Sequence, residues 1–492
     1  CGAVRRRRRN ILLGGDTLFV PGRHTKAEPE APFSRDPPFK SNQEYNVFFK
    51  EKDGTPAAAQ VKAFDDTWKW NEASARAYME IVESGPENVS RAMQAFRTIL
   101  GQNDMLAYLS MMAPVLVELR RVLKRTGSIY LHCDATASHY LKILMDAVFG
   151  PRNCRREVIW RSGWVSGFKS KAKNWARNHD VLLYYVRDFK ANWTFNKELA
   201  YKPHAEGYER RGGGENPKGV AIDDVWDDNE LYSPWIKSFS REKLGYATQK
   251  PVELLKRILS VCSNKGDVVL DPFCGCGTTI HAAQELGRYW IGIDITHLAI
   301  GLIKHRLEGA FGLVQRKDYD VVGEPTDLDG ARQLAAEDTH QFEHWALGLV
   351  GARSSAKGKG ADRGIDGRIY FHDDATGSET QEIVVSVKSG KIGVAAVRDL
   401  RGVLEREEAT MAVLVTMQPP TKAMLKEALA AGFFTSRWTG KKHPRLQILS
   451  VEDLLSGARV DMPPIGQVSV TFQRAKRVAE KGPGEKTLPF GD

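Results

Sequence analysis

The chain has 492 residues, enough for about three domains of roughly 150 residues each and for a sizeable buried core. Hydrophobic residues make up 42% and charged residues 27%, which excludes a disordered or fibrous protein. The 71 Lys and Arg outnumber the 61 Asp and Glu, and the formal charge of +10 favours a polyanionic partner without identifying it.

The apolar residues form no pattern typical of a membrane helix or a signal peptide. No uninterrupted apolar run approaches the ~18 residues of a membrane helix, so no membrane partner is expected. The arginines at 5–9 precede only three apolar residues, too few for a signal peptide. The six cysteines form no CxxC pair and no disulfide-like spacing, which predicts a reduced, cytoplasmic protein.

Helices and strands alternate in the first part of the chain. Asn103 can cap a helix whose apolar positions continue to Leu123, and residues 128–133 predict a strand. Asp134 is then placed to cap a second helix. Residues 151–245 are less regular, with strand-like stretches at 158–160 and 181–186, and residues 178–180 are interpreted as a structural corner rather than a catalytic pair.

Alternation resumes further on. The sequence predicts strands at 267–270 and 289–293 and helices at 278–286 and 297–307. A third region begins near Gly323, with a helix over 341–350, strands over 367–371 and 382–387, and more α/β alternation to about residue 455.

Residues 268–279 predict a nucleoside-binding turn. An apolar strand ends at Asp271, and Gly275 and Gly277 let a ligand approach the backbone before a helix whose free N–H groups favour negative charge. Asp294 ends the next strand, where a carboxylate can bind both hydroxyls of a ribose. A tight strand-to-helix turn explains the two glycines about as well.

The run Asp271-Pro-Phe273-x-Gly275-x-Gly277-Thr278 resembles the F-x-G-x-G loop of DNA methyltransferases that use S-adenosyl-L-methionine. Upstream, residues 248–251 resemble the T-Q-K-P element of the amino-methylating branch. The resemblance implies that Thr248 and Lys250 hold the methionine carboxylate of the cofactor. A helix start at Lys250-Pro251 is the plainer interpretation of the same residues.

Two smaller features accompany this loop. Gly15-Asp16 resembles the G-D-x-L element of the same enzymes, which implies that Asp16 meets the adenine of the cofactor; a surface turn is the alternative. Cys274 and Cys276 are interpreted as small loop residues, because one intervening residue is poor spacing for zinc ligands and no matching pair exists.

Asp36-Pro37-Pro38-Phe39 carries residue types that methylation of an exocyclic amine needs. A carboxylate and a carbonyl held by prolines can accept the N–H groups of the amine, and an aromatic ring can stack on an extruded base. The order of tetrapeptide, variable region, T-Q-K-P and glycine loop resembles β-class adenine-N6 and cytosine-N4 methyltransferases over about residues 10–315. Asp at the first position favours adenine, because the cytosine-directed relatives usually carry Ser there.

The segment before the tetrapeptide departs from that family, which enters it along a buried strand. Here residues 27–35 contain two prolines and no apolar alternation, and this argues against a central strand. The strand is therefore expected to be lost or altered, and methyl-transfer activity stays an open question.

Residues 151–245 mix cations with aromatic side chains, which favours a recognition region for double-stranded DNA; a solvated loop region is the alternative. In the third region, Asp366 and Lys388 occupy successive strands and resemble the PD-(D/E)xK fold of Mrr-type restriction endonucleases. The resemblance implies that Asp366 holds Mg²⁺, that Lys388 orients water, and that Glu343 is the upstream acid. Ser386 stands where that family has a second acid or Gln, and a basic α/β domain without this chemistry is the alternative.

The fold class expected is α/β: a Rossmann-like methyltransferase domain (1–325) with an inserted recognition region (151–245), then a restriction-endonuclease-like α/β domain (326–474) and a flexible tail (475–492). The expected function is site-specific adenine-N6 methylation of DNA in restriction-modification or phage defence. Alternatives are a DNA-binding or Mg²⁺-dependent DNA-cleaving protein with a defective methylase half, and a cytosine-N4 or RNA methyltransferase. The recognition sequence and oligomeric state stay open, and a homodimer is possible.

Overall fold

The computed structural model describes residues 9–13, 33–35, 69–161, 173, 175–202, 219–227, 249–354, 364–373 and 380–463, with only the backbone described in the first two ranges. The predicted tail, 475–492, lies outside them. The predicted site residues that also lie outside the described residues are Asp16, Asp36, Pro37, Pro38, Phe39 and Thr248.

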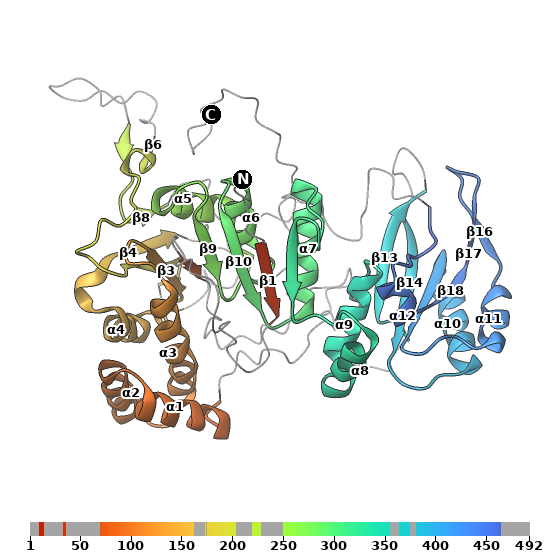
Figure 1. The fold of residues 1–492 in the computed structure, drawn as a ribbon, viewed down its shortest axis with the longest axis horizontal. Coiled ribbons are helices and arrows are strands. Elements are labelled where there is room, and N and C mark those ends of the chain that lie inside the picture. The colour runs from red at the N-terminus through yellow and green to blue at the C-terminus, as the bar shows by residue number, and fades with distance from the viewer. Residues whose placement is uncertain are drawn as a thin grey trace, which may run out of the picture.

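The larger sheet of the described chain has nine strands in the order β11-β1-β10-β9-β2-β3-β5-β4-β8 (Figure 1). The strands from β11 to β3 are parallel, whereas β5 runs antiparallel to both β3 and β4. This arrangement confirms the predicted Rossmann-like α/β class. The bounds are β1 Arg9–Leu13, β2 Phe33–Arg35, β3 Ser128–Cys133, β4 Cys154–Arg161, β5 His179–Val186, β8 Val225–Trp226, β9 Val268–Asp271, β10 Tyr289–Asp294 and β11 Tyr319–Val322.

β9 and β2 are parallel neighbours paired at Phe33 and Leu270, and the order in which the chain adds strands to the sheet changes direction between them. From β9 the chain continues to β10 on one side, and from β2 it continues to β3 on the other. In open α/β sheets, ligands bind at such a switch point, in the crevice outside the carboxyl ends of the strands. This edge of the sheet is therefore the expected location of a site.

The strand that enters the tetrapeptide is present, so the expectation of its loss is wrong. β2 is only three residues long, and it pairs with β3 on one side and β9 on the other. Pro29 and Pro32 both precede it, where a missing N–H removes no hydrogen bond from the strand itself. The chain thus reaches Asp36 directly from the middle of the sheet.

Helices cover both faces of this sheet (Figure 1). Successive side chains of a strand point to opposite faces, so Leu131 of β3 packs with helices α1 to α4, whereas its neighbour Tyr130 packs with α5, α6 and α7. The bounds are α1 Glu72–Ser84, α2 Glu87–Leu100, α3 Asp104–Val122, α4 Ser138–Phe149, α5 Val252–Cys262, α6 Thr278–Glu285 and α7 His297–Phe311.

One predicted helix cap is confirmed and one is wrong. Asn103 caps α3, because its Oδ1 accepts the N–H of Leu106 at 3.0 Å. Asp134 instead accepts the N–H groups of Thr136 and Ala137, in a turn that precedes α4, and α4 itself begins without a side-chain cap. The turn after β3 is longer than the sequence suggested, and Asp134 stays at the strand end.

A second sheet, β12-β13-β14-β15-β18, forms the C-terminal part (Figure 1). Helices α8, α9 and α12 pack on one face, and α10 and α11 on the other. The strand bounds are β12 Arg353–Ser354, β13 Gly367–His372, β14 Thr380–Lys388, β15 Met411–Thr416 and β18 Leu446–Ser450, with small pairs β6 Tyr201–Lys202 and β7 Val220–Ala221, and β16 Phe433–Thr435 and β17 Lys442–Pro444. The helix bounds are α8 Leu328–Glu337, α9 Thr339–Leu349, α10 Val394–Arg406, α11 Lys422–Leu429 and α12 Val451–Leu455.

Helix α9 also packs against α7, where Oε1 of Gln341 accepts the N–H of His297 at 3.2 Å. Among the helices described, none combines the length and apolar character that a bilayer crossing requires.

Candidate functional site

Hydrogen bonds fix the loop that follows β9. Asp271 is buried at the end of this strand, and its side chain accepts the N–H of Phe273 at 3.1 Å. The N–H of Cys274 donates to the carbonyl of Ile293 in the neighbouring β10 at 3.0 Å. The loop is thereby attached to two adjacent strand ends beside the switch point.

The two glycines of this loop are conformationally required. Gly275 and Gly277 have φ angles of 47° and 76°, in the left-handed region that favours glycine. A Cβ atom on Gly277 would lie 2.7 Å from Cγ1 of Ile303 in α7. Helix α6 begins directly after Gly277, and no side chain of the described residues caps its first N–H groups, which are the groups that favour an anion or a polar ligand.

Asp294, at the end of β10, directs its carboxylate at the same loop. Its Oδ2 accepts the N–H of Gly275 at 2.9 Å, and its Oδ1 accepts the N–H and the hydroxyl of Thr296, each at 2.9 Å. Burial raises the pKa of Asp294, against the opposing effect of the hydrogen bonds from Thr296 and Gly275. Asp294 therefore holds the glycine loop in place. The sequence predicts that the same carboxylate binds a nucleoside.

Lys250 lies at the amino end of α5 and is buried, with 6% of its surface exposed. Its positive charge acts on the carboxylate of Asp180, at the start of β5. Pro251 occupies the cap position of α5 with a φ of −65°, so the helix-start interpretation of these residues is confirmed. This helix start places Lys250 near Asp180, at the edge of the sheet where β5 begins.

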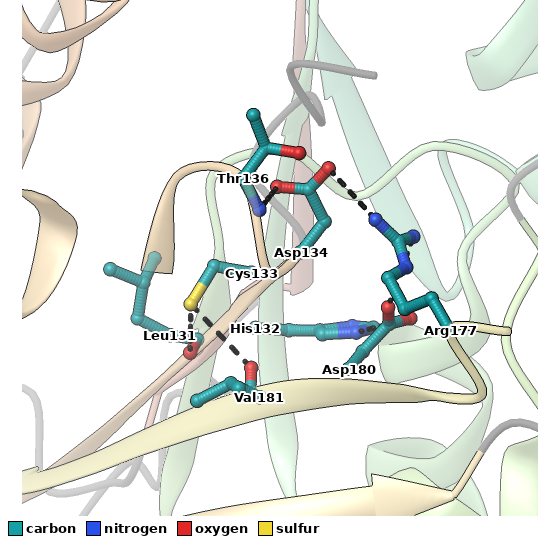
Figure 2. Close-up of polar contacts among 8 residues, drawn as sticks. All are labelled: Leu131, His132, Cys133, Asp134, Thr136, Arg177, Asp180 and Val181. Atoms are coloured by element: carbon teal, nitrogen blue, oxygen red, sulfur yellow. Dashed lines mark hydrogen bonds and ion pairs between the residues drawn. The ribbon is translucent and has the colours of Figure 1, made fainter. Parts of the chain in front are cut away.

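A network of polar residues joins the ends of β3 and β5 (Figure 2). Nε2 of His132 donates to Oδ2 of Asp180 at 3.3 Å, and the guanidinium of Arg177 lies 3.5 Å from both Asp134 and Asp180. The sequence predicted none of these residues as site residues. The signal that could have found them is the presence of a histidine and two acids within or beside otherwise apolar strands.

The two loop cysteines are buried as thiols. Burial raises the thiol pKa of both Cys274 and Cys276, and for Cys276 the charge of Arg306 opposes that shift. Protonated, buried thiols pack as small apolar groups. Within the part of the chain that the structure describes, no group of three His, Cys, Asp or Glu residues could hold a metal ion.

The predicted nuclease-like pair comes together in the second sheet. Asp366 is 3% exposed, and its Oδ2 lies 3.9 Å from Nζ of Lys388. The same oxygen accepts the hydroxyl of Ser386 at 3.1 Å and the N–H of Val387 at 2.7 Å. Glu343 is on α9. Ser386 stands where a second oxygen ligand of the metal would be needed, and its hydroxyl donates a hydrogen bond to Asp366 instead. These residues therefore do not fit Mg²⁺.

Replacing Asp366 with alanine is expected to destabilise the C-terminal sheet by about 1–3 kcal/mol, because two buried donors lose their acceptor. Calorimetric unfolding of the full chain measures this change, and Asp399→Ala, an exposed acid on α10, is the control. Addition of Mg²⁺ is expected to leave the transition of the unaltered chain unchanged. A Mg²⁺-dependent rise that disappears in Asp366→Ala would restore the metal-binding interpretation.

Two family models match the chain. A model described as DNA methylase matches residues 31–305, more than half of the chain. A model described as NACHT-associated inactive Restriction Endonuclease 1 matches residues 339–456, which supports the predicted endonuclease-like fold of the C-terminal part.

Individual relatives cover less of the chain. It is 32% identical to the type II methyltransferase M.BamHI of Bacillus amyloliquefaciens over 222 residues, 43% of this chain and 48% of that protein. It is 32% identical to the DNA adenine methyltransferase YhdJ of Escherichia coli (strain K12) over 203 residues, 40% of this chain and 65% of that protein. The chain thus spans about half to two thirds of the length of these relatives.

Among solved structures, the M1.HpyAVI–SAM complex matches with a TM-score of 0.28 and 21% identity, over 40% of this chain and 82% of that one. The sequence match over residues 31–305 includes the central strands and the glycine loop. On the strength of that match, the chain belongs to the DNA methylase family.

Proposed function

We propose that this protein is a site-specific methyltransferase that transfers a methyl group from S-adenosyl-L-methionine to N6 of adenine in double-stranded DNA. The observation that carries the proposal is the switch point between β9 and β2. The glycine loop follows β9, and Asp36 follows Arg35, the last residue of β2, so the chain directs both motifs to one edge of the sheet. The names of the relatives, adenine methyltransferase and type II methyltransferase, support this reaction.

The residues after β9 and β10 suit the cofactor that the family uses. Left-handed glycines, an amino end of α6 that no described side chain caps and a carboxylate on the adjacent strand match the needs of a nucleoside held against backbone. The residues that would hold it are Asp16, Asp271, Phe273, Gly275, Gly277, Thr278 and Asp294, with Thr248 and Lys250 on its carboxylate. S-adenosyl-L-methionine, when bound, supplies an electrophilic methyl group on a sulfonium sulfur.

The tetrapeptide would act on the target base. Asp36 and the carbonyl of Pro37 accept the two N–H groups of the exocyclic amine, which leaves the nitrogen lone pair free for the methyl group. Pro37 and Pro38 restrict the backbone that presents these acceptors. The ring of Phe39 stacks on the extruded base. A carboxylate at position 36 favours adenine over cytosine as the substrate.

The proposal assigns residues 1–325 to methyl transfer, with 151–245 as the recognition region, and residues 326–474 to the restriction-endonuclease-like domain, followed by the 475–492 tail. The hydrogen bond from Ser386 to Asp366 supports a C-terminal domain without Mg²⁺-dependent cleavage. The description of its matching family as inactive supports the same assignment.

Transfer of labelled methyl groups from S-adenosyl-L-methionine to unmethylated DNA tests the proposal. Label is expected in N6-methyladenine after digestion to nucleosides, at a small set of sequence positions. Label in N4-methylcytosine, in RNA alone, or in no nucleic acid although the cofactor raises the unfolding temperature, would contradict it.

A further inference from the structure

Two buried carboxylates lie next to each other at the edge of the sheet where the proposed reaction occurs. Cys133 of β3 and Val181 of β5 are paired in register, so Asp134, just after one, and Asp180, just before the other, are neighbours. Asp134 is 2% exposed and Asp180 is 8% exposed. Like charges opposite each other on adjacent strands are destabilising, and burial strengthens their repulsion.

Arg177 bridges the pair. Its Nη1 lies 3.5 Å from Oδ2 of Asp134, and its Nη2 lies 3.5 Å from Oδ1 of Asp180 (Figure 2). The remaining oxygen of Asp134 accepts the N–H groups of Thr136 and Ala137, and that of Asp180 accepts His132. Each carboxylate therefore offers one oxygen to a structural partner and the other to the guanidinium. We call Arg177, Asp134, Asp180 and His132 the Arg177 clamp.

The inner side of the clamp is buried and carries charge. Burial works to raise the pKa of Asp180, but the hydrogen bond and charge of His132, with the charges of Lys250 and Arg177, lower it below its ordinary value. The ring of His132 is 3% exposed and packs edge-on against Trp160 of β4, with centroids 5.4 Å apart. By contrast, 47% of the Arg177 side chain is exposed, so only this member faces the solvent to a large extent.

The clamp is also connected to the strand that leads into the tetrapeptide. Arg35, the last residue of β2, pairs with Leu131 of β3, three residues before Asp134. A displacement of the end of β3 therefore acts on the strand end from which Asp36 follows. Arg177 itself belongs to the predicted recognition region, so the clamp joins that region to the reaction edge.

We propose that the Arg177 clamp is a positioning device for methyl transfer: Arg177 bridges Asp134 and Asp180, offsets their repulsion, and so fixes the end of β3 beside the strand that precedes Asp36. This inference rests on the proposed function. Arg177 is a positioning residue in this scheme and touches neither the base nor the methyl donor. A change of about 1 Å in a reacting group can reduce a rate about 100-fold, so a loose β3 end has a measurable effect.

Steady-state methylation by four clamp variants tests the proposal. Arg177→Gln is expected to lower kcat by about 10- to 100-fold, with the KM for DNA and the affinity for S-adenosyl-L-methionine changed less than about threefold. Arg177→Lys is expected to recover part of the loss, because it keeps the charge but lacks the planar fork. Asp134→Asn keeps the acceptor for Thr136 and Ala137, removes one negative charge, and is expected to stay within about threefold of the unaltered protein.

The double variant Asp134→Asn/Arg177→Gln is the decisive one. With one carboxylate neutral, the repulsion that Arg177 offsets is gone, so its kcat is expected to return to within about threefold of Asp134→Asn alone. Arg91→Gln is the matched control: it removes the same charge from an exposed pair with Glu87 on α2, 3.6 Å apart and outside the proposed recognition region, and is expected to leave kcat unchanged.

Three results would overturn the proposal: an unchanged kcat in Arg177→Gln, a raised KM for DNA at constant kcat, which would make Arg177 a phosphate contact, or failure of Asp134→Asn to rescue. Absence of methylation by the unaltered protein is a different outcome, because it removes the proposed function before any variant is compared.

Discussion

Asp36→Ala is expected to lower kcat for adenine methylation by about 100- to 10,000-fold, the range over which a positioned proton acceptor contributes to an enzyme reaction. Without the carboxylate, only the carbonyl of Pro37 still accepts one of the two N–H groups, so the exocyclic amine keeps its lone pair conjugated with the ring. Labelled-methyl transfer at saturating DNA and cofactor measures the change.

The same variant has to keep its cofactor site for the result to be informative. S-adenosyl-L-methionine is expected to raise the unfolding temperature of Asp36→Ala as much as that of the unaltered protein, because the glycine loop follows a different strand. Asp329→Ala, an acid whose side chain is 90% exposed on α8, is the control. Undiminished methylation by Asp36→Ala would remove Asp36 from the mechanism.

Gly277→Ala is expected to destabilise the N-terminal sheet by about 2–5 kcal/mol and to abolish the stabilisation that S-adenosyl-L-methionine gives. A left-handed backbone costs an L-residue roughly 1–2 kcal/mol, and overpacking typically costs about 1–3 kcal/mol. Both costs apply here, because φ is 76° and the new Cβ would lie 2.7 Å from Ile303. Denaturant unfolding with and without the cofactor measures both effects.

Gly301→Ala is the matched control for this substitution. Gly301 lies inside α7, two residues from Ile303, and a Cβ there meets nothing within 4 Å. Alanine in a helix interior is expected to be neutral or to stabilise by about 0.5–1 kcal/mol. If Gly277→Ala unfolds at the same denaturant concentration as Gly301→Ala, the strain assigned to the loop is absent.

The elements that the sequence predicted well are those with strong local signals. Residues 128–133 are predicted and observed as a strand, and helix α6 begins at Thr278 in both. In each case the hydrophobic period, the glycines and the strand–loop–helix order lie within a few residues of one another. Asn103 is a similar case, since a cap and the helix that it starts are adjacent in the chain.

The features that the sequence predicted poorly depend on distant partners. β2 is a strand only because β3 and β9 provide hydrogen bonds on both sides, and its own three residues carry no apolar alternation. His132 and Asp180 are 48 residues apart and meet through the antiparallel pairing of β3 and β5. The sequence predicts a structural corner at residues 178–180, and this local pattern contains no information about His132, which lies on another strand.

The antiparallel direction of β5 has a consequence for where this part of the chain can accept other segments. Arg161 at the end of β4 pairs with His179 at the start of β5, so the seventeen-residue connection between them leaves and re-enters the sheet at one place. Segments of other lengths and compositions can be inserted after Arg161 while β4 and β5 keep their hydrogen-bonded pairing. Evolution, or an engineer, can thus exchange the residues between Arg161 and Arg177 as one unit and keep both the strands and the Arg177 clamp.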